Sequence, residues 1–234
     1  MKLTFHIITL FPEAFDSYLS SSILGRAIRE KKIGVKFYNP RDFSHDKWHR
    51  VDQRPYGGGP GMVLEAESIL KAVEAALRKV KSPQSRVKSK TQNSKLRTRN
   101  SAVVYFFDTS GKEFTNTDGR ALARKAKDLV LICGRYEGVD ARVQKILKAK
   151  KISVGPYVLT GGELPAMIVM DVTARQIPGV LGTFESVEEE RIAASEVYTR
   201  PEVLLWKGKK YKVPKVLLSG HHIKINEWKA KRMK

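Results

Sequence analysis

Three short segments combine glycine with polar residues directly after apolar runs. They are Asp108–Glu113 (DTSGKE), Gly134–Gly138 (GRYEG) and Gly155–Glu163 (GPYVLTGGE). Glycine permits positive φ and lets a ligand approach the main chain closely. A helix beginning near Glu163 would also point its first amide groups at the same space. A tight turn is the simpler interpretation of any one loop, but the three together favour a ligand site.

The absence of the common phosphate-binding motifs limits which ligands fit these loops. The sequence contains neither GxGxxG with a downstream acid nor GxxxxGK[ST], and the glycine run Gly57–Gly61 (GGGPG) lacks the Lys-Ser/Thr pair. Thr160 and Glu163 have capping-box spacing, but proline fits only the first helical turn, so Pro165 places the helix start near Gly162. An uncharged or zwitterionic adenosine-type ligand, held by main-chain groups, therefore fits better than a nucleoside triphosphate.

Apolar strands that alternate with helices must position these loops. The expected strands are Leu3–Thr9, Gly34–Tyr38, Ala102–Phe107, Leu129–Cys133 and Ile152–Val154. Helices are expected over 13–31 (in one or two pieces), 66–80, 119–126, 140–149 and 163–176. Strands that are apolar throughout predict an α/β fold with a parallel sheet covered on both faces. The glycine loops then follow the carboxyl ends of strands, where such sheets bind ligands.

Composition limits the class of protein. The chain has 234 residues, of which 41% are hydrophobic, enough for one core or for one core and a small second domain. No run of about 18 apolar residues is present, and the N-terminus lacks a signal-peptide cleavage site, so we expect no membrane association. The single cysteine, Cys133, is expected to be buried and suits a reducing, cytoplasmic location. His45, His49, His221 and His222 show no metal-ligand spacing, which predicts no structural metal.

The net charge of +20 is concentrated in two segments. Residues 78–100 hold nine Lys or Arg and no acid, and residues 207–234 hold ten basic residues and one acid, so together they carry +18. This pattern favours a nucleic acid partner, although a solubilising tail and a basic loop are the simpler alternative. We expect a domain over 1–182 with a flexible basic insertion at 81–100, a linker at 183–197, and a small basic C-terminal domain over 198–234.

Several longer motifs carry a resemblance to a known family. YVLTGGELPAM follows CGRYEG and RPYGGGPGM, and precedes IPGVLG, YTRPEV and SGHH. In this order the motifs resemble those of the bacterial tRNA (guanine-N1)-methyltransferases, the TrmD family of the SPOUT superfamily, over roughly residues 1–222 apart from the basic loop. The resemblance implies a SPOUT α/β domain with a deep C-terminal trefoil knot, and a small, mainly helical C-terminal domain that contacts tRNA.

The resemblance also implies a reaction. S-adenosylmethionine would donate a methyl group to N1 of guanosine 37 of tRNA, next to the anticodon, when position 36 is also guanosine. The family acts as a homodimer in which the partner completes each site, and its activity depends on Mg²⁺. Asp52 and Arg54 match residues near the target guanosine, with a loop ion pair as the alternative. The cofactor-binding positions are Gly134, Tyr136, Glu137, Val154, Gly155, Pro156, Tyr157, Val158, Leu159, Gly161, Gly162 and Pro165.

The catalytic positions of the family point to Arg175 and Glu190. N1 of guanine carries a proton, so a carboxylate must remove it while a cation stabilises the charge on O6. The family's base is an Asp fifteen residues after the Arg before IPG; here Arg175 precedes IPG, and Glu190 occupies the Asp position. Either the linker compensates for the longer side chain, or Glu188 or Glu189 is the base, or activity is reduced. Asp171 is a further candidate base, and without the resemblance 188–190 would be a solvated acidic linker.

Other departures leave the function open between two classes. Pro156 stands where the family usually has Asp, and the chain ends soon after SGHH and one helix, where the family usually continues. An active position-37 methyltransferase is the main hypothesis. The alternative is a catalytically weakened or inactive SPOUT protein that binds RNA. A SPOUT methyltransferase of ribosomal RNA is a third hypothesis, but YTRPEV and SGHH disfavour it.

Overall fold

The computed structural model describes residues 2–78, 102–182 and 196–232. The chain divides into two compact units, residues 1–180 and residues 181–234. The expected basic insertion and most of the expected linker, including residues 188–190, lie outside the described residues.

The first unit is built on a parallel sheet of five strands in the order β2-β1-β6-β5-β7. The strands are β1 (Leu3–Ile8), β2 (Ile33–Tyr38), β5 (Ala102–Glu113), β6 (Asp128–Ile132) and β7 (Lys150–Ser153). Every neighbouring pair runs parallel. The predicted parallel α/β sheet is therefore confirmed.

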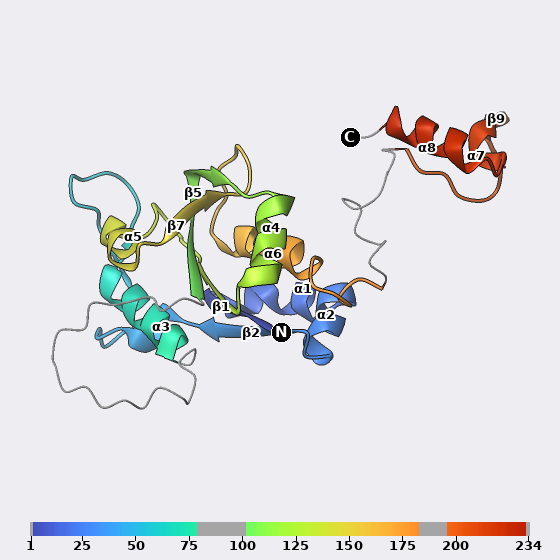
Figure 1. Ribbon diagram of the computed structural model, residues 1–234. Coiled ribbons are helices and arrows are strands. Elements are labelled where there is room, and N and C mark those ends of the chain that lie inside the picture. Colours follow the sequence, from blue (N-terminus) through green and yellow to red (C-terminus); the bar gives the residue numbers. More distant parts are fainter. Residues whose placement is uncertain (1, 79–101, 183–195, 233–234) are drawn as a thin grey trace. The chain divides into compact units, whose positions relative to one another are not determined.

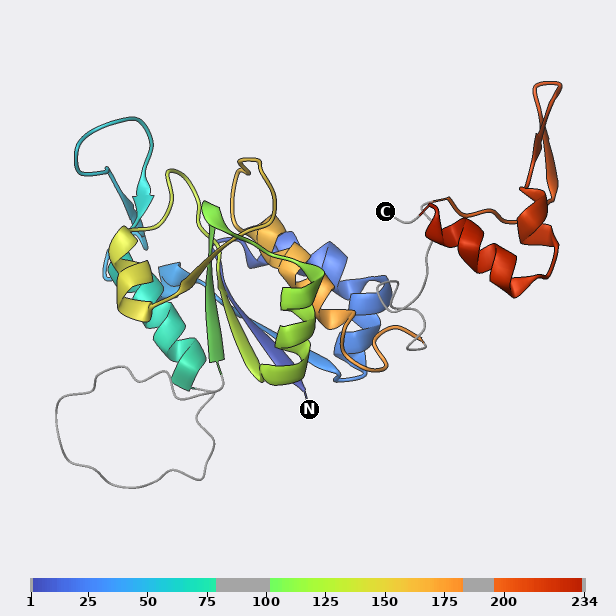
Figure 2. The ribbon, with the colours of Figure 1, turned by 45° about the horizontal axis from the view of Figure 1, so that its top comes forward.

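Helices cover both faces of this sheet (Figures 1 and 2). One face carries α1 (Asp16–Ser20), α2 (Ser22–Arg29), α4 (Asn116–Lys125) and α6 (Glu163–Ala174). The other carries α3 (Ala66–Arg78) and α5 (Ala141–Leu147). Successive strand residues point to opposite faces, so Ile7 packs into the first core and Ile8 into the second. Burial on both sides explains the continuous apolar runs Ala102–Phe107 and Leu129–Cys133 along β5 and β6.

The expectation of a loop at Asp108–Glu113 is wrong, because β5 continues to Glu113. The pairing of β5 with β7 shifts its register between Phe107 and Lys112, so the extra residues form an irregularity within the strand. A Cβ on Gly111 would lie 2.6 Å from the backbone nitrogen of Ile152. Glycine is needed here because two strands approach closely, and not because the chain turns.

Short elements occupy the region for which the sequence indicates little regular structure. Within residues 39–63 the 3-10 helix η2 (Pro40–Phe43) begins at a proline, as does η1 (Pro12–Phe15), which precedes α1 at the start of the expected helical stretch 13–31. The strands β3 (Asp52–Gln53) and β4 (Val63–Leu64) pair antiparallel around the glycine run.

The second unit contains a β-hairpin as well as helices. Its elements are β8 (Val203–Trp206), β9 (Lys209–Lys212), α7 (Lys215–Leu218) and α8 (His222–Ala230). The hairpin turns at Lys207 and Gly208, both with positive φ, as a two-residue hairpin loop requires. No helix within the described ranges is both long enough and apolar enough to cross a membrane.

Candidate functional site

A pocket of about 320 Å³ opens beside the irregularity in β5 and at the carboxyl ends of β6 and β7. Its volume is at the lower end of the range for small-molecule sites, roughly 300 Å³ and above. The walls come from three parts of the chain, residues 106–109, 134–139 and 152–165. All three glycine-containing segments of the sequence therefore contribute to one pocket.

The loop between β7 and α6 is held by its own hydrogen bonds. The Ser153 hydroxyl donates to the Gly155 carbonyl over 2.9 Å and accepts from the Gly155 amide over 3.2 Å. The Tyr157 hydroxyl donates to the Val154 carbonyl over 2.9 Å. A Cβ on Gly155 would lie 2.4 Å from the Tyr157 ring, so this position has no room for a side chain. The loop is thus shaped before any ligand binds.

The start of α6 packs directly against the loop that follows β6. The Gly162 amide donates to the Gly134 carbonyl over 2.9 Å, and Arg135 and Gly161 form an isolated antiparallel bridge. A Cβ on Gly162 would lie 2.5 Å from the Cα of Cys133. Glycine at position 162 therefore allows two backbone segments to pack closely, in addition to leaving room for the ligand that the sequence suggests.

The loop 134–138 is tied in turn to the glycine run at 57–61. The Glu137 amide donates to the Met62 carbonyl over 3.0 Å, and the Leu64 amide donates to the Gly138 carbonyl over 2.9 Å. A Cβ on Gly61 would lie 2.7 Å from the Glu137 carboxylate. These contacts attach the β3-β4 hairpin to a wall of the pocket.

Asp52 and Arg54 lie in this hairpin. Asp52 pairs with Leu64, which in turn bridges Val139 of the pocket wall. Asp52 is half-buried and Arg54 is exposed. The pairing brings Asp52 near the pocket, although neither residue lines it.

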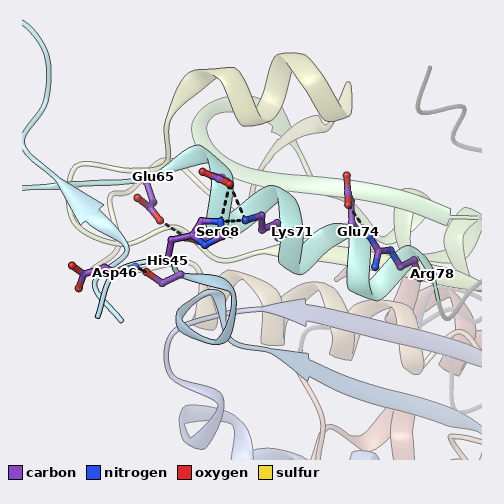
Figure 3. Close-up of polar contacts among 9 residues, drawn as sticks. His45, Asp46, Glu65, Ser68, Lys71, Glu74 and Arg78 are labelled. Carbon is purple, nitrogen blue, oxygen red and sulfur yellow. Dashed lines mark hydrogen bonds and ion pairs between the residues drawn. The ribbon is translucent and has the colours of Figure 1, made fainter. Parts of the chain in front are cut away.

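Polar contacts on α3 anchor the segment that leads into this hairpin (Figure 3). His45 Nε2 lies 3.2 Å from the Glu67 carboxylate, and Lys71 Nζ lies 2.8 Å from the same carboxylate. These groups are largely exposed, so each contact is worth little by itself. They connect the segment before Asp52 to α3.

All predicted cofactor-binding residues except Pro156 line the pocket. Pro156 is exposed within the same loop and is not one of the lining residues. The pocket also includes residues absent from that prediction, among them Asp108, Thr109 and Arg135. The segments DTSGKE and GRYEG indicated these positions, but not which of their side chains face the pocket.

The Asp108 carboxylate is charged at neutral pH. Hydrogen bonds from the Ser110 hydroxyl and then from Lys151 lower its pKa from 3.8 to about 2. The Lys151 ammonium lies 2.9 Å from Asp108 Oδ2. Among the described residues, the charged side chains lining the pocket are Asp108, Arg135 and Glu137.

A buried carboxylate that sequence reasoning missed lies behind this wall. Glu163 is 4% exposed and accepts a hydrogen bond of 2.7 Å from the Thr9 hydroxyl. Its second oxygen, Oε2, lies 3.0 Å from Arg135 Nε. Burial, followed by the Glu163 charge, raises the pKa of the Cys133 thiol well above its usual value, so this cysteine stays protonated.

The predicted catalytic residues are not brought together within the described chain. Arg175 follows the last residue of α6, whereas the pocket lies at the first turn of that helix. Ten residues of helix separate Pro165 from Arg175, a rise of roughly 15 Å. Asp171 accepts a hydrogen bond from the Tyr18 hydroxyl and does not line the pocket. Glu190 lies outside the described residues.

Within residues 2–78, 102–182 and 196–232, no group of three His, Cys, Asp or Glu side chains could hold a metal ion. The buried His6 instead contacts Asp128 over 2.8 Å and Tyr38 over 3.2 Å, between three strands of the sheet.

Comparison with known proteins places the chain in one family. The family model described as tRNA (Guanine-1)-methyltransferase TrmD matches residues 1–234. The tRNA (guanine-N(1)-)-methyltransferase of Pseudoalteromonas atlantica is 40% identical, over 97% of this chain and 79% of the relative. That of Clostridioides difficile is 41% identical, over 97% of this chain and 90% of the relative. The crystal structure of tRNA (m1G37) methyltransferase from Aquifex aeolicus matches with a TM-score of 0.74 and 34% identity, over 99% of this chain and 89% of that one. The chain belongs to the TrmD family of tRNA (guanine-1)-methyltransferases.

Proposed function

We propose that this protein transfers a methyl group from S-adenosylmethionine to N1 of guanosine 37 in tRNA. The observation that carries the proposal is the pocket lined by three glycine-containing segments, one at the irregularity in β5 and two after β6 and β7. Membership of the TrmD family, and the printed activity of the Aquifex relative, support the choice of substrate.

The lining of the pocket fits S-adenosylmethionine. The loops 134–138 and 155–162 line the pocket, where their main chain would lie beside an adenosine, and Ile152, Val154 and Leu159 give apolar contact. The donor carries a positive sulfonium and an amino group, and two acidic residues, Asp108 and Glu137, are among the lining residues. When bound, the donor supplies a methyl group already activated by its sulfonium.

The second unit supports tRNA as the partner. In the β8-β9 hairpin, Leu204 pairs with Tyr211 and Trp206 with Lys209, so these four side chains share one face. Trp206 and Tyr211 are 61% and 53% exposed. Aromatic rings beside lysines bind unpaired bases and phosphates together. We propose that this face contacts tRNA, as does the basic segment at 81–100, which lies outside the described residues.

A homodimer would complete the active site. Leu164, Ile168, Asp171 and Arg175 recur at helical spacing along one face of α6, and none of the four is buried. Leu164 is 50% exposed, although seven of the twelve residues of α6 are buried. A second copy on this face would cover the apolar residues and could bring Arg175 of one protomer to the pocket of its partner.

In this mechanism Glu190 removes the N1 proton and Arg175 stabilises the negative charge that develops on O6. Glutamate retains the carboxylate of the family's aspartate, so the proton transfer keeps the same chemistry. The pocket walls fix the donor while the tRNA presents the guanine, and this alignment lowers the entropic part of the barrier. The trefoil knot, a dependence on Mg²⁺ and a cytoplasmic location remain predictions.

The test of Glu190 is the Glu190→Gln protein, with Glu188→Gln and Glu189→Gln as matched controls. Methyl transfer to a tRNA transcript should fall at least about 100-fold for Glu190→Gln, the loss typical of a removed general base, and only slightly for the controls. Full turnover by Glu190→Gln would remove that residue from the mechanism. A large loss in one of the controls would reassign the base.

A further inference from the structure

Glu163 has no part in the mechanism above, yet it is the most deeply buried carboxylate near the pocket among the described residues. It is 4% exposed and stands at the first position of α6. It does not line the pocket. Burying a carboxylate is costly unless charge and hydrogen bonds compensate, so its partners show what it does.

Those partners come from two other parts of the chain. Thr9, directly after β1, donates its hydroxyl to Glu163 Oε1 over 2.7 Å. The same Thr9 oxygen accepts from the Phe11 amide over 3.0 Å, which orients the hydroxyl. Arg135, two residues beyond Cys133 at the end of β6, places Nε 3.0 Å from Glu163 Oε2. Glu163 therefore joins the ends of β1 and β6 to the start of α6.

The contact with Arg135 rests on charge. Arg135 Nε and Glu163 Oε2 are both inaccessible to solvent and have no well-aligned hydrogen-bond partner among the described residues, although they lie 3.0 Å apart. The guanidinium also lies over the Phe11 ring at 4.5 Å from its centre. Loss of the Glu163 charge would leave a cation that is 26% exposed without its closest counter-ion.

Unlike Glu163, Arg135 does line the pocket. It bridges Gly161 across the two loops, and its Nη1 reaches the Thr160 carbonyl over 3.5 Å. A Cβ on Gly161 would lie 2.5 Å from Arg135 Nε and 2.6 Å from Glu163 Oε2, so the pair packs tightly against this glycine. The position of Arg135 thereby sets the spacing between two walls of the pocket.

We propose that Glu163 is a positioning residue for the methyl donor: with Thr9 it holds Arg135, and through Arg135 it keeps the loops 134–138 and 159–162 at the separation that binds S-adenosylmethionine. This inference rests on the proposed function, because it takes the pocket to be the donor site. It differs from a purely structural role in requiring that donor affinity depend on the Glu163 charge.

The first experiment measures the Kd of S-adenosylmethionine by titration calorimetry on the full-length protein. Glu163→Gln keeps the shape and removes the charge, and its Kd should rise about tenfold or more. Asp128→Asn is the matched control, because it removes a carboxylate that contacts the buried His6 at the amino end of β6, the opposite end of that strand from Arg135. Its Kd should stay within about twofold of the wild-type value even if its unfolding temperature falls.

A second pair of variants tests the same contact without changing a charge. Thr9→Val removes the hydroxyl and should raise the Kd of the donor. Thr9→Ser retains the hydroxyl, so its Kd should stay near the wild-type value. If Glu163→Gln fails to fold, this pair decides the matter. In steady-state kinetics, a positioning role predicts a raised KM for the donor, with kcat at saturating donor and KM for tRNA nearly unchanged.

A double-mutant cycle with Arg135→Gln identifies the route of the effect. If Glu163 acts through Arg135, the variant that carries both substitutions should have a donor Kd no higher than that of whichever single variant binds the donor less tightly. Fully additive losses, or a wild-type Kd in folded Glu163→Gln, would overturn the inference. If the wild-type protein itself does not bind S-adenosylmethionine, the proposed function fails instead, and the two failures are thereby distinguished.

Discussion

Replacing Gly162 by alanine tests how the pocket is built. Gly162 has φ −84° and ψ −5°, a conformation open to any residue, so the substitution causes no backbone strain. The added Cβ would lie 2.5 Å from the Cα of Cys133 and 2.8 Å from the backbone nitrogen of Gly134. Both atoms belong to the main chain at the end of β6, so neither can rotate away. The two loops must separate.

The size of the effect follows from that overlap. Forcing one extra methyl group into a packed region costs about 1–3 kcal/mol. For a chain of this length, each kcal/mol lowers the unfolding temperature by roughly 2–4 °C, so a decrease of about 2–12 °C is expected. Separation of the loops would also lengthen the 2.9 Å hydrogen bond from the Gly162 amide to the Gly134 carbonyl. Donor affinity should therefore fall together with stability.

Two further glycine substitutions separate a loss of stability from a loss of donor affinity. At Gly182 an added Cβ meets no atom within 4 Å, so Gly182→Ala should match the wild type in thermal unfolding and in donor Kd. At Gly134 the nearest atom is Val139 Cγ2 at 3.6 Å, an ordinary contact, but the residue lines the pocket. Gly134→Ala should thus weaken donor binding at nearly unchanged stability. If Gly162→Ala had the unfolding temperature and the donor Kd of the wild type, the close packing of these loops would be refuted.

Three other predictions concern charge, RNA and assembly. The folded-state pKa of Asp108 is about 2, below its ordinary 3.8, so its carboxylate contributes stability that is present above about pH 4 and lost as the pH falls toward 2. Asp108→Asn should therefore be less stable than the wild type in unfolding at pH 6, with a difference that shrinks toward pH 2; a constant difference would contradict this. Trp206→Ala should weaken tRNA binding by about 1–3 kcal/mol, measured by fluorescence titration. Leu205→Ala is the control, because Leu205 lies on the other face of the hairpin. Equal losses of tRNA affinity in the two variants would exclude stacking of a base on Trp206. Mixing Arg175→Ala chains with Gly134→Val chains should restore methyl transfer that neither has alone, and no recovery would argue against a shared site.

The sequence was sufficient for the sheet because its strands carry a strong local signal. Ala102–Phe107 and Leu129–Cys133 are apolar at every position, as burial on both faces requires. Asp108–Glu113 looked like a loop because its composition is polar and includes Gly111. Only the approach of β7 shows that this glycine accommodates a neighbouring strand. Local composition could not reveal that contact.

The sequence indicated which loops form the site, but it did not indicate the contacts between segments far apart in the chain. The glycine-containing segments located three parts of the pocket wall, and the family resemblance named many of the lining residues but not Asp108, Thr109 or Arg135. The hydrogen bond between Thr9 and Glu163 joins residues 154 positions apart, which no local pattern indicates. Helical spacing likewise could not show that Asp171 meets Tyr18, a contact that raises the pKa of Tyr18 to about 12.

The most direct test of the proposed function is transfer of labelled methyl from S-adenosylmethionine to an unmodified tRNA transcript with guanosine at positions 36 and 37. A matched transcript with adenosine at position 37 is assayed beside it, and nuclease digestion with mass spectrometry identifies the product. Label in the first transcript alone, recovered as 1-methylguanosine at position 37, is the expected result. No label in either transcript, from folded protein that still binds the donor, would contradict the proposed methyl transfer and leave an RNA-binding protein.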